Sequence, residues 1–248
     1  MAGCSGCREG RTLPFEISVA FQPIVDLESG APYAYEALVR GSQGESAGWV
    51  LDQVSEDNRY TFDQACRVAA IEGAVAAGIL ETDARLSINF LPNAVYSPMA
   101  CIQLTLATAR ATGLPPERLI FEFTEHEQVD PQHVIGILEA YRTLGFTTAI
   151  DDFGAGHSGL GLLAEFQPDL IKLDMELIRG IDVSPPRRMI VDATVRLCAD
   201  MGLTVIAEGI ETEGELSALR DLGVRYVQGF HLARPGWREC QDALRAAA

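Results

Sequence analysis

The chain has 248 residues, of which 48% are hydrophobic and 22% are charged. These values are ordinary for a globular protein and exclude a disordered chain, a collagen and a coiled coil. With 19 Lys and Arg residues against 35 Asp and Glu residues, the formal net charge is −16, which argues against a fold-wide positive field and against duplex nucleic acid as a partner.

The first residues of the chain contain a lone Cys-x-x-Cys motif, formed by Cys4 and Cys7. No second Cys pair stands at zinc-finger spacing, so we interpret residues 1–16 as a flexible segment, with metal or redox chemistry at the motif as the alternative. This segment lacks the apolar stretch of a signal peptide, and no apolar run in the chain reaches the ~18 residues of a membrane span. We therefore expect a reduced, cytoplasmic protein without a membrane span.

From residue 17 onward, short apolar runs rich in β-branched and aromatic residues alternate with longer helical patterns. The apolar runs predict about eight strands, at residues 17–25, 33–39, 86–90, 119–123, 146–151, 170–174, 204–208 and 225–229. Their hydrophobicity is continuous rather than alternating, as in parallel strands buried on both faces. The helical patterns between them include residues 62–77, 100–112, 131–144, 186–201 and 213–222. Several of these helices are followed by a glycine suited to end a helix, namely Gly113, Gly145, Gly202 and Gly223.

Strands that alternate with helices about eight times in roughly 250 residues predict an α/β fold, a (β/α)8 TIM-like barrel that occupies residues 17–248. One connection departs from this alternation of strands and helices. The first two predicted strands are joined by residues 26–30, which are too few for a crossover helix. Such a connection makes a hairpin, so we expect a barrel with one antiparallel strand.

Nearly every predicted strand carries a polar residue where an apolar one would pack better. These residues are Glu36, Asn89, Glu122, Asp151, Asp152, Lys172, Asp174, Glu208 and Gln228. In a parallel barrel the carboxyl ends of the strands converge on one face, where barrel active sites lie. Burying several carboxylates together without cations costs too much free energy, so the pattern predicts a divalent metal site.

The ligand types of this site limit its metal and its chemistry. Oxygen ligands favour Mg²⁺, Mn²⁺ or Ca²⁺ over zinc, and the carboxylates exceed what one ion needs, so we expect two ions. Adjacent Asp151 and Asp152 can each serve one ion, or one of them can bridge both. Two metals suit in-line displacement at phosphorus. Lys172 is expected to stay protonated among the acids and to orient the attacking water or a phosphate oxygen. Arg40 suits bidentate phosphate recognition, with an ordinary surface arginine as the alternative.

These residues, in this order, resemble the EAL domain, the family of cyclic di-GMP phosphodiesterases. The resemblance runs from about Ser18 to Arg234 and rests on eight stretches, at residues 22–26, 35–40, 87–89, 121–125, 151–156, 171–174, 207–211 and 228–230. It implies an enzyme that hydrolyses cyclic di-GMP to the linear dinucleotide pGpG. The open alternatives are a receptor that binds cyclic di-GMP without hydrolysing it and an unrelated barrel hydrolase, such as a glycosidase that uses two carboxylates.

The resemblance also implies a role for each matching residue. The implied metal ligands are Glu36, Asn89, Glu122, Asp151, Asp152 and Glu208. The implied catalytic residues are Lys172, Glu36 and Glu208. The implied substrate contacts are Gln22, Arg40 and Gln228, and the residues expected to support the site and its loop are Glu125, Asp174 and Glu211. The implied cofactor is Mg²⁺ or Mn²⁺, two ions in all, with Ca²⁺ inhibitory, and a homodimer is a possible assembly.

Overall fold

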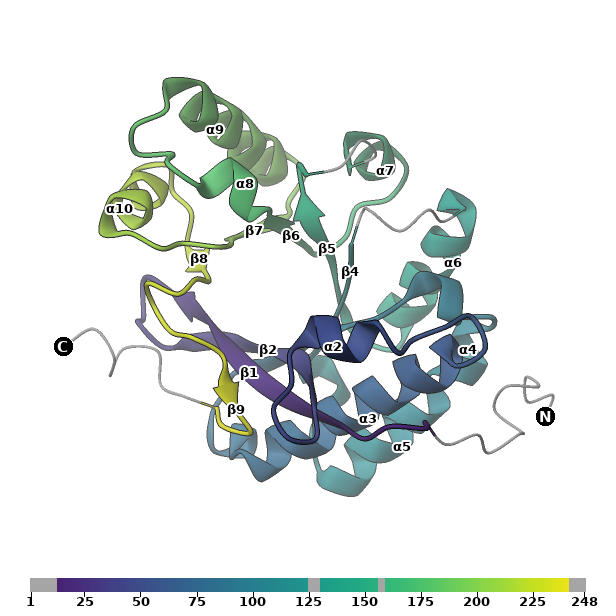
Figure 1. The fold of residues 1–248 in the computed structure, drawn as a ribbon. Coiled ribbons are helices and arrows are strands. Elements are labelled where there is room, and N and C mark those ends of the chain that lie inside the picture. Colours follow the sequence, from purple (N-terminus) through teal and green to yellow (C-terminus); the bar gives the residue numbers. More distant parts are fainter. Residues whose placement is uncertain (1–12, 125–129, 156–158, 241–248) are drawn as a thin grey trace.

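Our computed structural model describes residues 13–124, 130–155 and 159–240 (Figure 1). Within these residues nine strands form one sheet in the order β2-β3-β4-β5-β6-β7-β8-β1-β9, and a further pairing of β1 with β2 closes the first eight into a barrel. The strands are β1 (Ile17–Asp26), β2 (Pro32–Gly41), β3 (Arg85–Asn89), β4 (Leu119–Thr124), β5 (Thr147–Phe153), β6 (Leu170–Leu173), β7 (Thr204–Ala207), β8 (Tyr226–Val227) and β9 (Gly236–Trp237).

The antiparallel strand of the barrel is β1, which pairs antiparallel with β2 and β8, whereas β2 to β8 pair with one another in parallel. The predicted fold class, including the hairpin between the first two strands, is therefore confirmed. The seam between β8 and β1 is short, with two paired positions. Arg225 strengthens it by donating two hydrogen bonds to the Asp26 carboxylate, from Nε at 2.8 Å and from a terminal nitrogen at 2.7 Å.

Helices surround the outside of the barrel (Figure 1). They are α2 (Ala47–Leu51), α3 (Arg59–Ala76), α4 (Pro98–Cys101), α5 (Gln103–Thr112), α6 (Pro131–Thr143), α7 (Gly159–Glu165), α8 (Met175–Ile178), α9 (Pro185–Asp200) and α10 (Glu213–Asp221), with 3-10 turns at Ile79–Glu81, Pro92–Ala94 and Pro116–Arg118. The helix predicted at 100–112 is instead two helices, α4 and α5. The short elements α2, α7, α8 and β9 were not predicted, because so few residues carry no recognisable hydrophobic period.

Local sequence explains where several helices begin and end. The side chain of Asp130 accepts a hydrogen bond from the backbone N–H of Gln132 and so caps α6, with Pro131 in the first turn. Thr212 and Glu215 form a reciprocal capping box at the start of α10. All four glycines predicted to terminate helices have positive φ values, between 74° and 82°, as that position requires.

The apolar residues form two cores. The larger core lies between the barrel and its helices. The smaller core fills the inside of the barrel with one layer of side chains, from Ile24, Ala34, Ile120, Ala149, Leu170 and Ile206. Of the helices in the described part of the chain, none combines the length and the apolarity that crossing a bilayer requires.

Candidate active site

The acidic site lies directly on top of the apolar layer inside the barrel. Side chains two positions apart on a strand point to the same face, so residues two positions beyond the apolar layer also point inward. On β2, β4, β5 and β6 those positions hold Glu36, Glu122, Asp151 and Lys172, and directly after the end of β7 the same position holds Glu208. On antiparallel β1 the equivalent position comes two residues before Ile24 and holds Gln22, which is paired with Glu36 in the sheet register. The barrel thus gathers on one face polar residues that are far apart in the sequence.

Lys172 lies at the centre of this layer. Its Nζ atom is 2.6 Å from Glu208 Oε1, 3.0 Å from Asp151 Oδ1, 3.2 Å from Glu122 Oε2 and 3.4 Å from Glu36 Oε2. The Lys172 side chain is 1% exposed and that of Glu122 is fully buried. Among the described residues of this layer, one ammonium faces four carboxylates, which leaves an excess of negative charge.

Amide and hydroxyl donors hold the carboxylates on the β2–β4 side. Asn89 donates one hydrogen bond to Glu36 Oε1 at 3.1 Å and another to Glu122 Oε1 at 3.0 Å. Ser87 donates to Glu122 Oε2 at 2.7 Å, and Gln228 donates to Glu36 Oε2 at 2.8 Å. These bonds fix the orientation of both glutamates.

A bulge in β5 brings two consecutive aspartates to the site. The pairing of β5 with β6 shifts register between Ile150 and Phe153, and Asp152 has a left-handed backbone with φ of 54°. In a regular strand, neighbouring side chains point to opposite faces, so the bulge lets Asp151 and Asp152 share one side.

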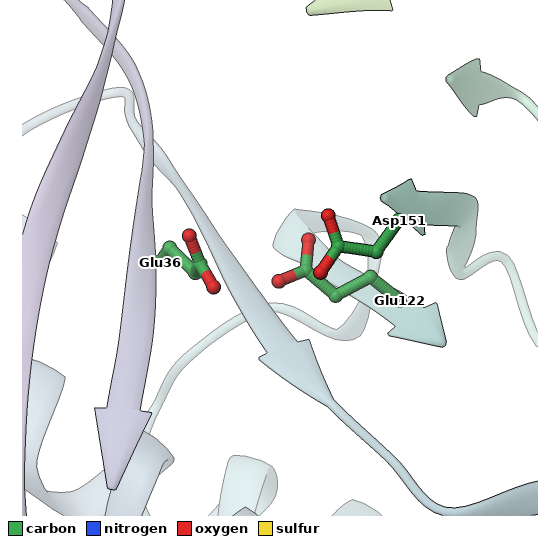
Figure 2. Close-up of side chains that lie close together, drawn as sticks. All are labelled: Glu36, Glu122 and Asp151. Atoms are coloured by element: carbon green, nitrogen blue, oxygen red, sulfur yellow. The ribbon is translucent and has the colours of Figure 1, made fainter. Parts of the chain in front are cut away.

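The carboxylates form two overlapping groups. The first carboxylate group consists of Glu36, Glu122 and Asp151, whose side chains point toward one another from three strands (Figure 2). The second carboxylate group consists of Asp151, Asp152 and Glu208. In each group one oxygen per residue lies within 4.8 Å of the others, and Asp151 belongs to both.

Burial and charge shift the pKa values in this layer. Burial alone would lower the pKa of Lys172, but the four surrounding carboxylates raise it well above its ordinary value. Burial raises the pKa of Glu122 and of Glu208 well above the usual range despite the nearby ammonium. Burial would also raise the pKa of Glu36, yet Lys172 and the hydrogen bond from Gln228 hold it below its ordinary value. Lys172 therefore stays charged, as its acidic surroundings predicted.

The residues of this layer fit a divalent cation. Asp151 Oδ1 and Glu208 Oε1 are buried and, within the described residues, accept no hydrogen bond of good geometry, although both face the Lys172 ammonium, which they share with Glu36 and Glu122. Buried carboxylate oxygens need a donor or a cation, and a single ammonium does not balance four carboxylates. An all-oxygen ligand set favours Mg²⁺, Mn²⁺ or Ca²⁺.

The other residues singled out in the sequence lie around this layer or outside it. Gln22 donates to the backbone oxygen of Ala233 at 3.2 Å. Arg40 is half-buried and donates to the carbonyl oxygen of Val39 at 2.7 Å, and burial lowers its pKa although the charge of Glu36 opposes this. Arg40 and Glu36 are four residues apart on β2 and therefore lie on the same face of that strand.

Two residues expected to support the site contact the two ends of the short helix α8. Asp174 caps α8 by accepting from the backbone N–H of Glu176 at 2.8 Å. Glu211 forms a two-point ion pair with Arg179 near the surface. Three further positions lie outside the described residues, namely Cys4, Cys7 and Glu125.

The sequence analysis missed Ser87 and a buried ion pair behind Asn89. Asp63 and Arg67 are fully buried on α3 with 2.8 Å between their charged atoms, and Asp63 accepts from the backbone N–H of Leu91 at 3.0 Å. This bond anchors the segment that follows Asn89. The spacing of Asp63 and Arg67, four residues apart within an apolar helix, was a signal available in the sequence.

Comparisons with known proteins give a consistent family match. A model of the EAL domain matches residues 14–235. The blue light- and temperature-regulated antirepressor BluF of Escherichia coli is 34% identical over 87% of this chain and 53% of BluF. The probable cyclic di-GMP phosphodiesterase PdeN of the same species is 28% identical over 88% of this chain and 43% of PdeN. The chain thus spans about half the length, or less, of these curated relatives.

Two solved structures share the fold closely. A standalone versatile EAL protein from Vibrio cholerae, bound to cyclic di-GMP, has a TM-score of 0.88 and 47% identity, and the match covers 92% of this chain and 95% of that one. BlrP1 of Klebsiella pneumoniae, in a complex with manganese and cyclic di-GMP, has a TM-score of 0.84 and 37% identity over 92% of this chain and 58% of that one.

Proposed function

The chain belongs to the EAL domain family, and we propose that it is a metal-dependent phosphodiesterase that hydrolyses cyclic di-GMP to linear pGpG. The observation that carries this proposal is the pair of overlapping carboxylate groups that share Asp151, with the Lys172 ammonium among them. Two ions held this way suit in-line displacement at phosphorus. A non-hydrolysing binding site has no need for so complete a set of ligands.

The similar proteins support the substrate and the metal. PdeN is named as a probable cyclic di-GMP phosphodiesterase, and BlrP1 was solved with manganese and cyclic di-GMP. For this chain we propose Mg²⁺ or Mn²⁺ as the working ions. Calcium is expected to bind and inhibit, because its larger and looser coordination sphere positions water poorly.

Six residues are proposed to hold the ions, namely Glu36, Asn89, Glu122, Asp151, Asp152 and Glu208. When bound, divalent ions favour deprotonation of water and neutralise charge on phosphate oxygens. Lys172 supplies a buried ammonium that orients the water or a phosphate oxygen, and the Glu208 carboxylate, in its ionised form beside Lys172, is proposed to accept the proton that the water loses. Arg40, Gln22 and Gln228 are proposed to bind and orient the substrate, with Arg40 facing a phosphate.

The direct test is incubation of the purified chain with cyclic di-GMP and Mg²⁺ or Mn²⁺, with the products separated by chromatography. We expect pGpG to form, its formation to stop with excess chelator, and activity to return when either ion is restored. Full activity in excess chelator would contradict the metal-dependent proposal.

The second candidate function is a receptor that binds cyclic di-GMP without hydrolysing it. One observation favours it: BluF, the 34% identical relative, is named as an antirepressor rather than as a phosphodiesterase. Calorimetric binding measured beside the hydrolysis assay separates the two. Tight binding with no product under any divalent ion would establish the receptor and exclude the enzyme.

We also propose a homodimer, for which α9 offers a surface. Met189, Ile190 and Leu197 are large apolar residues of α9 that are 71%, 51% and 39% exposed. A second copy of the chain would remove them from water. Light scattering should give twice the chain mass, and charged substitutions at Met189 and Ile190 should lower it to one chain mass. A monomeric parent chain would refute the dimer.

A further inference from the structure

The short helix α8 lies between the two segments that carry the second carboxylate group. On one side, the backbone N–H of Asp174 donates to the carbonyl oxygen of Phe153 at 3.2 Å, directly after Asp152. On the other side, the backbone N–H of Glu208 donates to the carbonyl oxygen of Leu173 at 3.2 Å. The strand that leads into α8 is thus bonded to both segments at the level of the site.

Residues of α8 pack closely against a glycine in each of the two segments. Gly154 comes two residues after Asp152, and a Cβ atom there would lie 2.4 Å from Leu177 Cδ1. Gly209 directly follows Glu208, and a Cβ atom there would lie 2.3 Å from Met175 Cβ and 3.1 Å from its Cα. Both glycines have positive φ values, 99° and 67°. The helix therefore touches the bare backbone of both segments, with no room for a side chain between them.

Both ends of α8 are held in place. At its start, the Asp174 carboxylate caps the helix at the N–H of Glu176. After its end, Arg179 pairs with Glu211, and the backbone N–H of Gly180 donates to Glu215 Oε1 at 2.9 Å. Glu215 also accepts from the backbone N–H groups of Glu211 and Thr212. These contacts fix the position of α8 at both of its ends.

We propose that α8 is a spacer that sets the distance between Asp152 and Glu208, and that Met175 and Leu177 are therefore positioning residues for the second carboxylate group. The inference rests on the proposed function, since it assigns the spacer to one of the two proposed metal ions. Changes to residues that orient metal ligands commonly lower metal affinity 10- to 100-fold, so a displaced spacer should weaken the binding of one ion and leave the other unchanged.

The test compares substitutions that disturb the spacer with a matched control. Gly209→Ala places a methyl group against Met175, whereas Gly223→Ala, at a φ of 78°, meets nothing within 4 Å. The two changes carry similar backbone strain and differ in the contact with α8. Leu177→Ala removes a spacer side chain without any glycine change. Gly154→Ala alone creates a clash with Leu177, and combining it with Leu177→Ala removes that clash. The double variant should therefore bind Mn²⁺ more tightly than Gly154→Ala alone.

The measurement is Mn²⁺ binding to each full chain by electron paramagnetic resonance, which reports the number of ions, their dissociation constants and the magnetic coupling between neighbouring ions. In the parent we expect two coupled ions. In Gly209→Ala and Leu177→Ala we expect one ion to bind at least tenfold more weakly and the coupling to be lost, with the other ion unchanged. Gly223→Ala should match the parent.

Failure of the spacer and failure of the proposed function give different results. A parent chain that binds one ion refutes the two-metal function, whatever the variants do. The spacer is then judged by that ion alone, and weaker Mn²⁺ binding in Leu177→Ala relative to Gly223→Ala supports it. At either stoichiometry, Mn²⁺ affinities in Leu177→Ala and Gly209→Ala equal to those of the parent overturn the spacer.

Discussion

Lys172 is the single lysine of the 248-residue chain, whose other basic side chains are arginines and histidines. It lies where four carboxylates converge, and a compact ammonium contacts them all in a space that a planar guanidinium would fill differently. Its burial and charge suit a role in orienting the reacting groups rather than in accepting a proton.

Replacing Lys172 and Glu36 should separate chemistry from metal binding. Lys172→Ala should largely keep the affinity for cyclic di-GMP, because Arg40 and the ions remain, but should lower turnover by a factor on the order of 10² or more. Glu36→Ala removes an anionic ligand and should weaken metal binding as well as turnover. Calorimetry with cyclic di-GMP beside steady-state hydrolysis checks both variants. A Lys172→Ala chain that works at the parent rate would remove Lys172 from the mechanism.

The unique lysine also allows a direct titration. The protein labelled with ¹⁵N at the lysine side chain should give one side-chain amine signal. We expect this signal to remain that of an ammonium through pH 10.4, the ordinary lysine pKa, because the surrounding carboxylates raise the pKa of Lys172. Saturating Mg²⁺ should lower that pKa, since the ions offset the same negative charge. A pKa at or below the ordinary value without Mg²⁺ would contradict the electrostatics described for the site.

At the scale of elements, the buried ion pair of α3 supports the segment after Asn89. Arg67 is fully buried, forms the ion pair with Asp63 and donates a 2.8 Å hydrogen bond to the hydroxyl of Tyr141. Its guanidinium carbon lies 5.6 Å from the ring centroid of Phe90 and 5.4 Å from that of Phe121. Removing one partner of a buried pair leaves an uncompensated charge, whereas replacing both with apolar groups is often tolerated.

Asp63→Ala should therefore lower the free energy of unfolding by about 3–5 kcal/mol. The double variant Asp63→Ala, Arg67→Met should be much less destabilised, because it leaves no unpaired guanidinium buried in the core. Urea denaturation followed by circular dichroism measures both. If the double variant is as unstable as the single one, the loss comes from cavity formation or from the bond to Leu91 and not from the unpaired charge.

The same elements show what sequence can and cannot predict here. Glu36 and Lys172 were found because each places a charged residue inside an otherwise apolar strand, and the barrel brings these positions together. Ser87 was missed because a hydroxyl inside a strand is too common to attract notice. The helix α8 was missed because four residues carry no period, and its place depends on contacts with Gly154 and Gly209 that are distant in the chain.

At the scale of the whole molecule, the barrel depends on closing the seam between its first and eighth strands. With two paired positions in β8, the backbone ladder there is short, and the Asp26–Arg225 pair joins residues 199 positions apart. Asp26 is 11% exposed at its side chain and also accepts bonds from the backbone of Glu28 and the hydroxyl of Ser29. The hydrogen bond from Arg225 holds the pKa of Asp26 below its ordinary value, although burial opposes this.

Asp26→Asn should lower the melting temperature at pH 7 by roughly 2–4 °C, because the charged pair that closes the seam is lost. A group with a lowered folded-state pKa stabilises the fold above its ordinary pKa, and that contribution is lost as pH falls through the ordinary value toward the folded one. The difference in melting temperature between the parent and Asp26→Asn should thus be constant above about pH 5 and shrink progressively below about pH 4.

Glu28→Gln is the matched control. Glu28 contacts the same arginine at 2.7 Å, but its side chain is 69% exposed, and ion pairs this exposed add little stability. Calorimetric melting of all three chains at pH 7, 5 and 3 tests this prediction. If the difference in melting temperature between the parent and Asp26→Asn stays constant down to pH 3, the Asp26 charge does not stabilise the closed barrel.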